Sequence, residues 1–143
     1  MKVKQLLGIV VAFILTLSIG VAGAQDETDI TTINLDDNSI TVDGDGAEAT
    51  DSSVTITAAG SYNLTGALAE GQIIVNTQDA EPVSLNLNGI TIASASAAPI
   101  YVQNAASVVL VLAENSQNVV TGTAAYASTE ELPNAAIVSS ADL

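Results

Sequence analysis

The chain has 143 residues, a formal net charge of −14, and neither cysteine nor histidine. Its two basic residues, Lys2 and Lys4, lie at the N-terminus, whereas all 16 acidic residues follow residue 25. Nucleic acids and anionic membranes are bound through Lys and Arg, so this composition excludes both as partners. Neutral molecules remain as partners, together with cations such as calcium that can bridge the protein to other anions.

Residues 1–24 have the pattern of a secretory signal peptide. Lys2 and Lys4 precede an apolar run over residues 6–21, which ends in the small residues Ala22-Gly23-Ala24. This pattern predicts cleavage after Ala24 and a secreted or cell-surface protein with no membrane contact after cleavage. An uncleaved membrane anchor is the alternative, because the apolar run is marginally long enough to span a bilayer.

The remaining chain divides into a lead-in and one domain. Residues 25–32 are polar and acidic, and we expect them to be disordered. In residues 33–143, short runs of Val, Ile and Leu alternate with Thr, Ser and Asn and are bounded by Gly, Asn, Asp or Pro, which is typical of short strands. With one Phe and no Trp in the chain, aliphatic side chains must fill the core.

The short strands recur along the chain. The run 85–87 matches the later run 110–112 and the earlier run 54–56, and the run 73–75 matches the later run 100–102. A loose period of this kind favours an all-β, three-faced parallel β-helix of few coils, with a β-sandwich as the alternative. In this interpretation the stretch LNLNGITI turns a corner between two faces of the solenoid.

The last residues begin another strand. The stretch PNAAIVSSADL, residues 133–143, carries strand-forming residues and no polar cap. We therefore expect the solenoid to be C-terminally incomplete, or to be completed by another chain. An open end of this kind exposes unpaired backbone groups and favours self-association.

Several segments together resemble a known family. They are VTITAAGSYNLTGAL, GQIIVNT, VSLNLNGITI, APIYVQNAASVVLVLAENSQN and LPNAAIVSSADL, which cover much of residues 54–143 in this order. The chain resembles the bacterial carbohydrate-binding parallel β-helix family that is related in fold to pectate lyases. The resemblance implies a right-handed parallel β-helix over residues 33–143, secretion, calcium sites, and affinity for plant-type polysaccharides.

The residue types present limit catalysis. After signal cleavage the chain has no His, Cys, Lys or Arg, so it offers no Ser-His pair, thiolate or Schiff base. The β-helix pectate lyases, to which the family is related in fold, usually abstract a proton with Arg or Lys, so lyase chemistry is disfavoured. A pair of carboxylates suffices for glycan hydrolysis, and Asp79 and Glu81 are a candidate pair. A solvated bend between strands is the alternative interpretation of these two acids.

The stretch ITVDGDGAEATDSSVTI, residues 40–56, is the candidate metal site. Asp43 and Asp45 supply oxygen ligands of the kind that calcium prefers. Aligned on Gly46, however, the stretch has Thr41 and Ser52 where an EF-hand needs carboxylates. Asp43 and Asp45 are therefore candidate partial calcium ligands, and the other interpretation is a turn that its glycines allow.

The three tyrosines are the candidates for an aromatic sugar platform. Tyr62 is in phase with Leu64 and is expected to point inward, whereas Tyr101 alternates with Ile100 and Val102 and should face outward. Tyr126 lies in the least regular segment. Tyr101, with outward Asn and Gln neighbours, is thus the candidate carbohydrate-binding residue, while Asn86 and Asn88 are expected to form ladders or fill turns.

Three functions follow from these observations. The first is a secreted, non-catalytic carbohydrate-binding module for plant-type or acidic polysaccharides, assisted by calcium. The second is a structural or adhesive cell-surface β-solenoid that self-associates through its open end. The third is a glycan hydrolase that uses carboxylates alone.

Overall fold

The computed structural model describes residues 29–37, 39–123 and 134–143. Within these ranges the regular elements are all β-strands, and no helix is long and apolar enough to cross a membrane. The strands are β1 (Ile30–Leu35), β2 (Thr41–Asp43), β3 (Ala47–Ala49), β4 (Ser53–Ile56), β5 (Gly60–Leu68), β6 (Gln72–Asn76), β7 (Val83–Ser94), β8 (Ile100–Asn104), β9 (Val108–Leu112), β10 (Val119–Gly122) and β11 (Ile137–Ser139).

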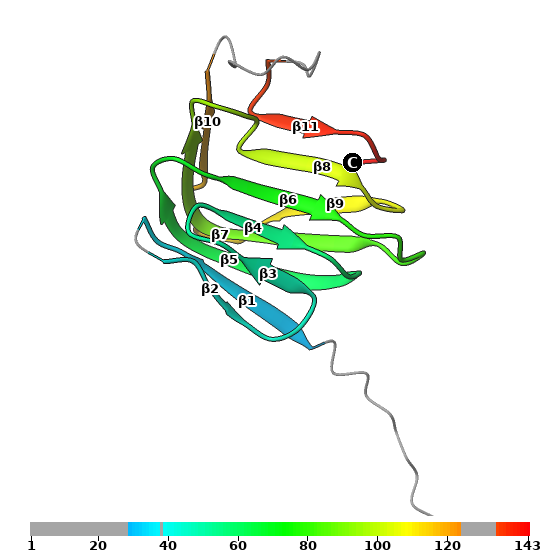
Figure 1. The fold of residues 1–143 in the computed structure, drawn as a ribbon. Helices are drawn as coiled ribbons and strands as arrows, with labels where there is room; N and C mark the ends of the chain where they lie inside the picture. The colour runs from blue at the N-terminus through cyan, green and yellow to red at the C-terminus, as the bar shows by residue number, and fades with distance from the viewer. Residues whose placement is uncertain (1–28, 38, 124–133) are drawn as a thin grey trace, which may run out of the picture.

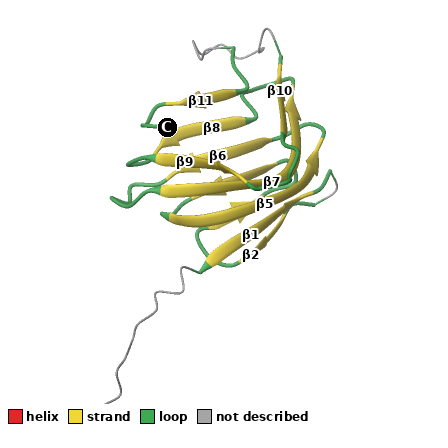
Figure 2. Ribbon diagram, turned by 180° about the vertical axis from the view of Figure 1, so that it is seen from behind, coloured by secondary structure: helices red, strands yellow, loops and turns green. Residues whose placement is uncertain are grey.

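The strands form two sheets (Figure 1). The first sheet has the order β10-β7-β5-β1-β2, and β9 also pairs with β7. The second has the order β11-β8-β6-β4-β3. From β4 to β8 the chain passes from one sheet to the other at each step, so strands that are neighbours in a sheet are not neighbours in sequence (Figure 2).

Both sheets are mixed. Pairing is parallel throughout the described strands except at the N-terminal edge of each sheet, where β2 lies antiparallel to β1 and β3 lies antiparallel to β4. Residues 44–46 join β2 to β3 and so carry the chain from the first sheet to the second. The N-terminal edge of the whole molecule is thus built by one turn and its two short strands.

The two long strands of the first sheet bend partway along their length. In β7 the bend lies at Gly89, whose φ of 77° is unfavourable for residues with a side chain. The Oδ1 atom of Asn118 accepts hydrogen bonds from the backbone N–H groups of Gly89 and Ile90, at 2.9 and 3.0 Å. Before the bend β7 pairs with β9, and after it β7 pairs with β10. One strand thereby supports two partners.

A single aliphatic core lies between the sheets. In both sheets alternate strand residues point inward and are buried. The core contains the side chains of Ile33, Val54, Ile56, Leu64, Ile73, Val75, Leu85, Ile92, Ile100 and Val102. Complete burial of each such side chain contributes about 1.5–3 kcal/mol. The expectation of an aliphatic core is confirmed.

The prediction of a right-handed, three-faced parallel β-helix is wrong. The structure has two mixed sheets, which fits the β-sandwich alternative, although most strand pairs are parallel. The error lies at LNLNGITI, where the prediction placed a corner between two faces. Instead, β7 continues through Gly89, and the two expected faces are one bent sheet. The antiparallel strands β2 and β3 were also not expected.

The prediction that the strands recur along the chain was correct in part. The match between the runs 85–87 and 110–112 is confirmed by the register of Leu85 with Leu110. The match between the runs 73–75 and 100–102 is confirmed by the register of Ile73 with Ile100. The proposed match between 54–56 and 85–87 is wrong, because β4 belongs to the second sheet and β7 to the first.

The described chain starts close to the predicted domain boundary. Strand β1 begins at Ile30, whereas the prediction began the domain at residue 33 and assigned residues 25–32 to a disordered lead-in. Thr31 is already buried and pairs in register with Tyr62, so residues 30–32 belong to the sheet. The signal peptide prediction for residues 1–24 lies outside the described residues.

Candidate functional site

Tyr101 lies where the alternation predicted. On β8 it is half-exposed, while its neighbours Ile100 and Val102 are buried in the core. Its register partners on the adjacent strands are Ile74 in β6 and Val138 in β11. Tyr101 therefore presents its ring on the outer face of the second sheet. Tyr62 is buried, as expected, and Tyr126 lies outside the described residues.

Asp43 ends β2, and Asp45 lies in the turn, residues 44–46, that joins the two sheets. Both side chains are exposed, and the two glycines between and after them, Gly44 and Gly46, have φ values of 120° and 82°. These positive values require glycine at the turn. The interpretation of this stretch as a glycine-permitted turn is confirmed, and the two acids are positioned by it.

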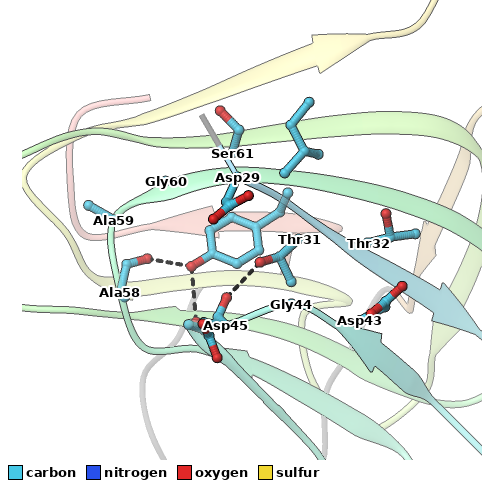
Figure 3. Close-up of a pocket in the computed structure, with 13 residues that line it drawn as sticks. Asp29, Thr31, Thr32, Asp43, Gly44, Asp45, Ala58, Ala59, Gly60 and Ser61 are labelled. Atoms are coloured by element: carbon cyan, nitrogen blue, oxygen red, sulfur yellow. Dashed lines mark hydrogen bonds between the residues drawn. The ribbon is translucent and has the colours of Figure 1, made fainter. Parts of the chain in front are cut away.

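This turn forms one wall of a pocket of about 560 Å³ (Figure 3). The Oγ1 atom of Thr31 donates a hydrogen bond of 2.6 Å to the backbone carbonyl of Asp45. The opposite wall is the turn before β5, so the pocket lies between three segments that are distant in sequence. Its lining is Asp29, Ile30, Thr31, Thr32, Asp43, Gly44, Asp45, Gly46, Ala58, Ala59, Gly60, Ser61 and Tyr62.

Tyr62 fastens two of these segments to each other. Its hydroxyl lies 3.0 Å from the carbonyl oxygen of Gly46 and 2.8 Å from that of Ala58, and it donates its one hydrogen to this pair. Burial raises the pKa of Tyr62 above its usual value of 10.0, and the negative charge of Asp79 raises it further. The hydroxyl therefore stays protonated at neutral pH and holds the pocket in shape.

The pocket contains oxygen atoms that can act as metal ligands, but no compact cluster of carboxylates. Asp29, Asp43 and Asp45 line it, and in Figure 3 Asp43 and Asp45 lie on either side of Gly44. Among the described residues, no three acidic side chains are close enough together to hold a metal ion. A cation here would have to complete its coordination shell with carbonyl oxygens, hydroxyls, water or a bound ligand.

Asp79 and Glu81 also border a common pocket, of about 600 Å³, together with Ser61 and Ser84. Asp79 has a structural role there, because its Oδ2 atom accepts a 2.7 Å hydrogen bond from the backbone N–H of Ala59. Both side chains are exposed at the turn between β6 and β7. This arrangement agrees with the interpretation of the pair as a solvated bend.

Asn86 forms part of a ladder, as expected. Its Nδ2 donates a 3.2 Å hydrogen bond to Oδ1 of Asn63, its register partner on β5. Asn88 is exposed beside the bend of β7. No sequence pattern pointed to Asn118, because the backbone groups that it binds belong to a strand far from it in sequence.

Comparison with known proteins assigns a family. A family model described as carbohydrate-binding domain-containing protein matches residues 50–143. The chain belongs to this family. The sequence resemblance to a carbohydrate-binding family is thereby confirmed at this level.

Two related proteins are similar over most of the chain. A carbohydrate-binding domain-containing protein from Acetivibrio thermocellus is 32% identical over 115 residues, which cover 78% of this chain and 40% of the relative. A solved structure of a polysaccharide lyase-like protein from C. thermocellum, a gadolinium derivative, superposes with a TM-score of 0.73 at 32% identity, covering 78% of this chain and 47% of that chain. The chain thus spans less than half the length of either protein.

Proposed function

We propose that the chain is a secreted, non-catalytic carbohydrate-binding module for plant-type or acidic polysaccharides, assisted by calcium. The observation that carries the proposal is the half-exposed ring of Tyr101 on a sheet face, in a chain that belongs to a carbohydrate-binding family. Secretion is supported by the leader pattern of residues 1–24.

The surroundings of Tyr101 suit a sugar chain. Gln103, two residues further along β8, is exposed on the same side of the strand, and Ile74 lies beside Tyr101 on β6. An aromatic ring offers a flat apolar surface to the C–H face of a sugar, while amides bind its hydroxyls. These side chains carry no charge, so they impose no electrostatic cost on an uncharged sugar ring.

A binding role is favoured over catalysis by the residue types and by the relatives. The family name describes binding, although the solved relative is called lyase-like. The chain after residue 24 has no Lys, Arg or His to abstract a proton. Of the two candidate carboxylates for hydrolysis, Asp79 is already bound by the backbone of Ala59.

We propose that calcium binds in the pocket that contains Asp43 and Asp45. The side chains and carbonyl groups that line it offer oxygen atoms, which calcium prefers as ligands. Because the carboxylates are few and spread out, we expect weak binding of calcium alone. Carboxylates of an acidic polysaccharide would complete the shell and join the polymer to the protein.

A pull-down with polygalacturonate and with uncharged plant polysaccharides tests the proposal. We expect calcium to increase retention on polygalacturonate, and Asp43→Asn/Asp45→Asn to remove that increase. Tyr101→Ala should weaken retention, whereas Tyr101→Phe keeps the ring and should bind like the wild type. Undiminished binding to polygalacturonate in excess chelator would overturn the role of calcium, and absence of retention on every polymer would overturn the function itself.

A second candidate function is a self-associating surface module, and one observation favours it. Most of the exposed large hydrophobic side chains lie on β9, β10 and β11 or just after them, at one end of the two sheets, namely Val109, Val111, Leu112, Val119, Ile137 and Leu143. Exposed apolar residues at sheet edges favour association with another copy. Light scattering over a concentration series distinguishes the two functions, since this one predicts growing oligomers without polysaccharide.

A further inference from the structure

Charge is distributed unevenly between strands and turns. Among the described strands, only the short antiparallel strands contain acidic residues, Asp43 in β2 and Glu48 in β3. The other described acids lie in turns, at the ends of strands or in the lead-in to β1. The parallel strands are therefore uncharged in a protein whose net charge is −14.

The outer side of β1, β5 and β7 forms a continuous polar surface, which we call the amide face. Its side chains alternate with the buried core residues and are exposed or half-exposed. Register aligns them in rows across the sheet, because Thr32 pairs with Asn63 and Asn63 with Asn86. The amide face consists of Thr32, Asn34, Asn63, Thr65, Ser84 and Asn86.

Hydrogen bonds between strands fix these side chains. Asn86 donates to Asn63, and the Oγ1 atom of Thr65 donates a 3.2 Å hydrogen bond to Oδ1 of Asn34. Side chains that are already ordered lose little conformational entropy when a ligand binds. The amide face thus presents aligned hydroxyl and amide groups at the spacing between neighbouring strands, about 4.8 Å. The buried Oδ1 of Asn86 is not among the presented groups.

We propose that the amide face is a second carbohydrate-binding surface, which takes an uncharged polysaccharide chain without calcium. This inference rests on the proposed function, because it assumes that the chain binds carbohydrate. Amides and hydroxyls both donate and accept hydrogen bonds, as sugar hydroxyls do. The six residues of the face carry no carboxylate, while Asp43, the register partner of Thr32 on β2, and the acidic turns around the face disfavour anionic polymers.

This surface is separate from that of Tyr101. Thr32, Asn63 and Asn86 lie on the outside of the first sheet, whereas Tyr101 lies on the outside of the second, with the core between them. A molecule with both surfaces holds two polysaccharide chains at once. Binding to both would give an avidity greater than that of either surface and would link chains to each other.

Affinity electrophoresis through gels that contain hydroxyethylcellulose, glucomannan or polygalacturonate tests the inference in excess chelator. The wild-type chain should be retarded by at least one of the two uncharged polymers. Asn63→Asp keeps the shape of the side chain but adds a charge and changes a donor to an acceptor, so it should weaken that retention roughly tenfold. Asn115→Asp makes the same change in an exposed turn and serves as the matched control.

A second variant guards against loss of folding. Thr32 is exposed at the same row, so Thr32→Glu places a charge on the amide face without touching the core. We also expect the uncharged polymers to retard Tyr101→Ala weakly, and not to retard the double variant Tyr101→Ala/Asn63→Asp. Circular dichroism confirms that each variant is folded.

The outcomes separate this inference from the proposed function. If the uncharged polymers retard Asn63→Asp and Thr32→Glu as strongly as they retard the wild-type chain, the inference is overturned. It is also overturned if Tyr101→Ala alone abolishes retardation by the uncharged polymers. In both cases carbohydrate binding by the chain still stands. If no polymer retards the wild-type chain, with or without calcium, the proposed function fails and the inference fails with it.

Discussion

Glu70 shows how one exposed side chain can hold two distant segments together. It lies between β5 and β6, and its carboxylate accepts hydrogen bonds from the Ser94 and Ser96 hydroxyls, at 3.0 and 2.9 Å, and from the Ala95 backbone N–H at 2.8 Å. The Ala95 N–H is the largest cause that lowers the pKa of Glu70, followed by the Ser96 hydroxyl. These partners lie beyond the next strand in sequence, so no local pattern could identify Glu70.

We predict that Glu70→Gln destabilises the fold in a pH-dependent manner. A carboxyl whose pKa is lowered by folding stabilises the native state above its unfolded pKa, near 4.5, and this contribution is lost as pH falls through the folded pKa. At neutral pH the variant should lose about 1 kcal/mol in urea unfolding, a modest value because the group is exposed. The loss should shrink towards pH 3.

Glu81→Gln is the control for this experiment, because Glu81 is likewise exposed in a turn. A difference between wild type and Glu70→Gln that stays constant from pH 7 to pH 3 would show that the negative charge of Glu70 is not the cause.

At the level of elements, the side chain of Asn118 binds the backbone on both sides of the bend of β7. The Nδ2 atom of Asn118 donates to the carbonyl of Leu87 at 3.0 Å, and its Oδ1 atom accepts from Gly89 and Ile90. We expect Asn118→Ala to lower the free energy of unfolding by about 2 kcal/mol, because it removes the acceptor of the Gly89 and Ile90 N–H groups. The carbonyl of Leu87, in contrast, keeps its hydrogen bond from the N–H of Ala113. Urea unfolding measures this, and the neighbouring exposed Gln117→Ala should have little effect. Equal losses in both variants would contradict the assignment.

The amide ladder ends at β9. Oδ1 of Asn86 is buried and has no hydrogen-bond partner among the described residues, and its register partner on β9 is Val111, which cannot donate. Val111→Thr keeps the shape of the side chain and adds a hydroxyl, so we predict a gain of about 1 kcal/mol in stability. Val109→Thr changes the next outward position of β9 and should be nearly neutral. A thermal melt with no gain for Val111→Thr would show that the hydroxyl does not reach Asn86.

The elements also show what the sequence could and could not predict. Alternation identified the core and placed Tyr62 inward and Tyr101 outward, because burial on one face of a strand has a period of two. It did not distinguish a bend within β7 from a corner between faces, since both need a glycine at residue 89. The calcium and sugar contacts of Asp43, Asp45 and Tyr101 stay predictions, because they depend on ligands that alternation does not encode.

At the level of the whole molecule, the acidic turns repel one another. No basic residue after Lys4 offsets the 16 acids, so long-range repulsion acts against the compact state. We predict that the melting temperature rises by a few degrees as sodium chloride increases from about 0.01 M to about 0.15 M, since the Debye length falls from about 30 Å to about 8 Å. Differential scanning calorimetry measures the change, and sodium sulfate at equal ionic strength is the control. A melting temperature that falls with salt would contradict this account.

The separation of charged turns from uncharged parallel strands has a consequence for solubility. Acidification towards the isoelectric point, near pH 4.1, removes the repulsion that keeps neighbouring molecules apart. It leaves the backbone ladders of the parallel strands unaffected, because those strands contain no titrating acid. Precipitation is thus controlled by the acidic turns, and in mild acid, above the pH at which Glu70 loses its charge, the protein should leave solution with its sheets still formed.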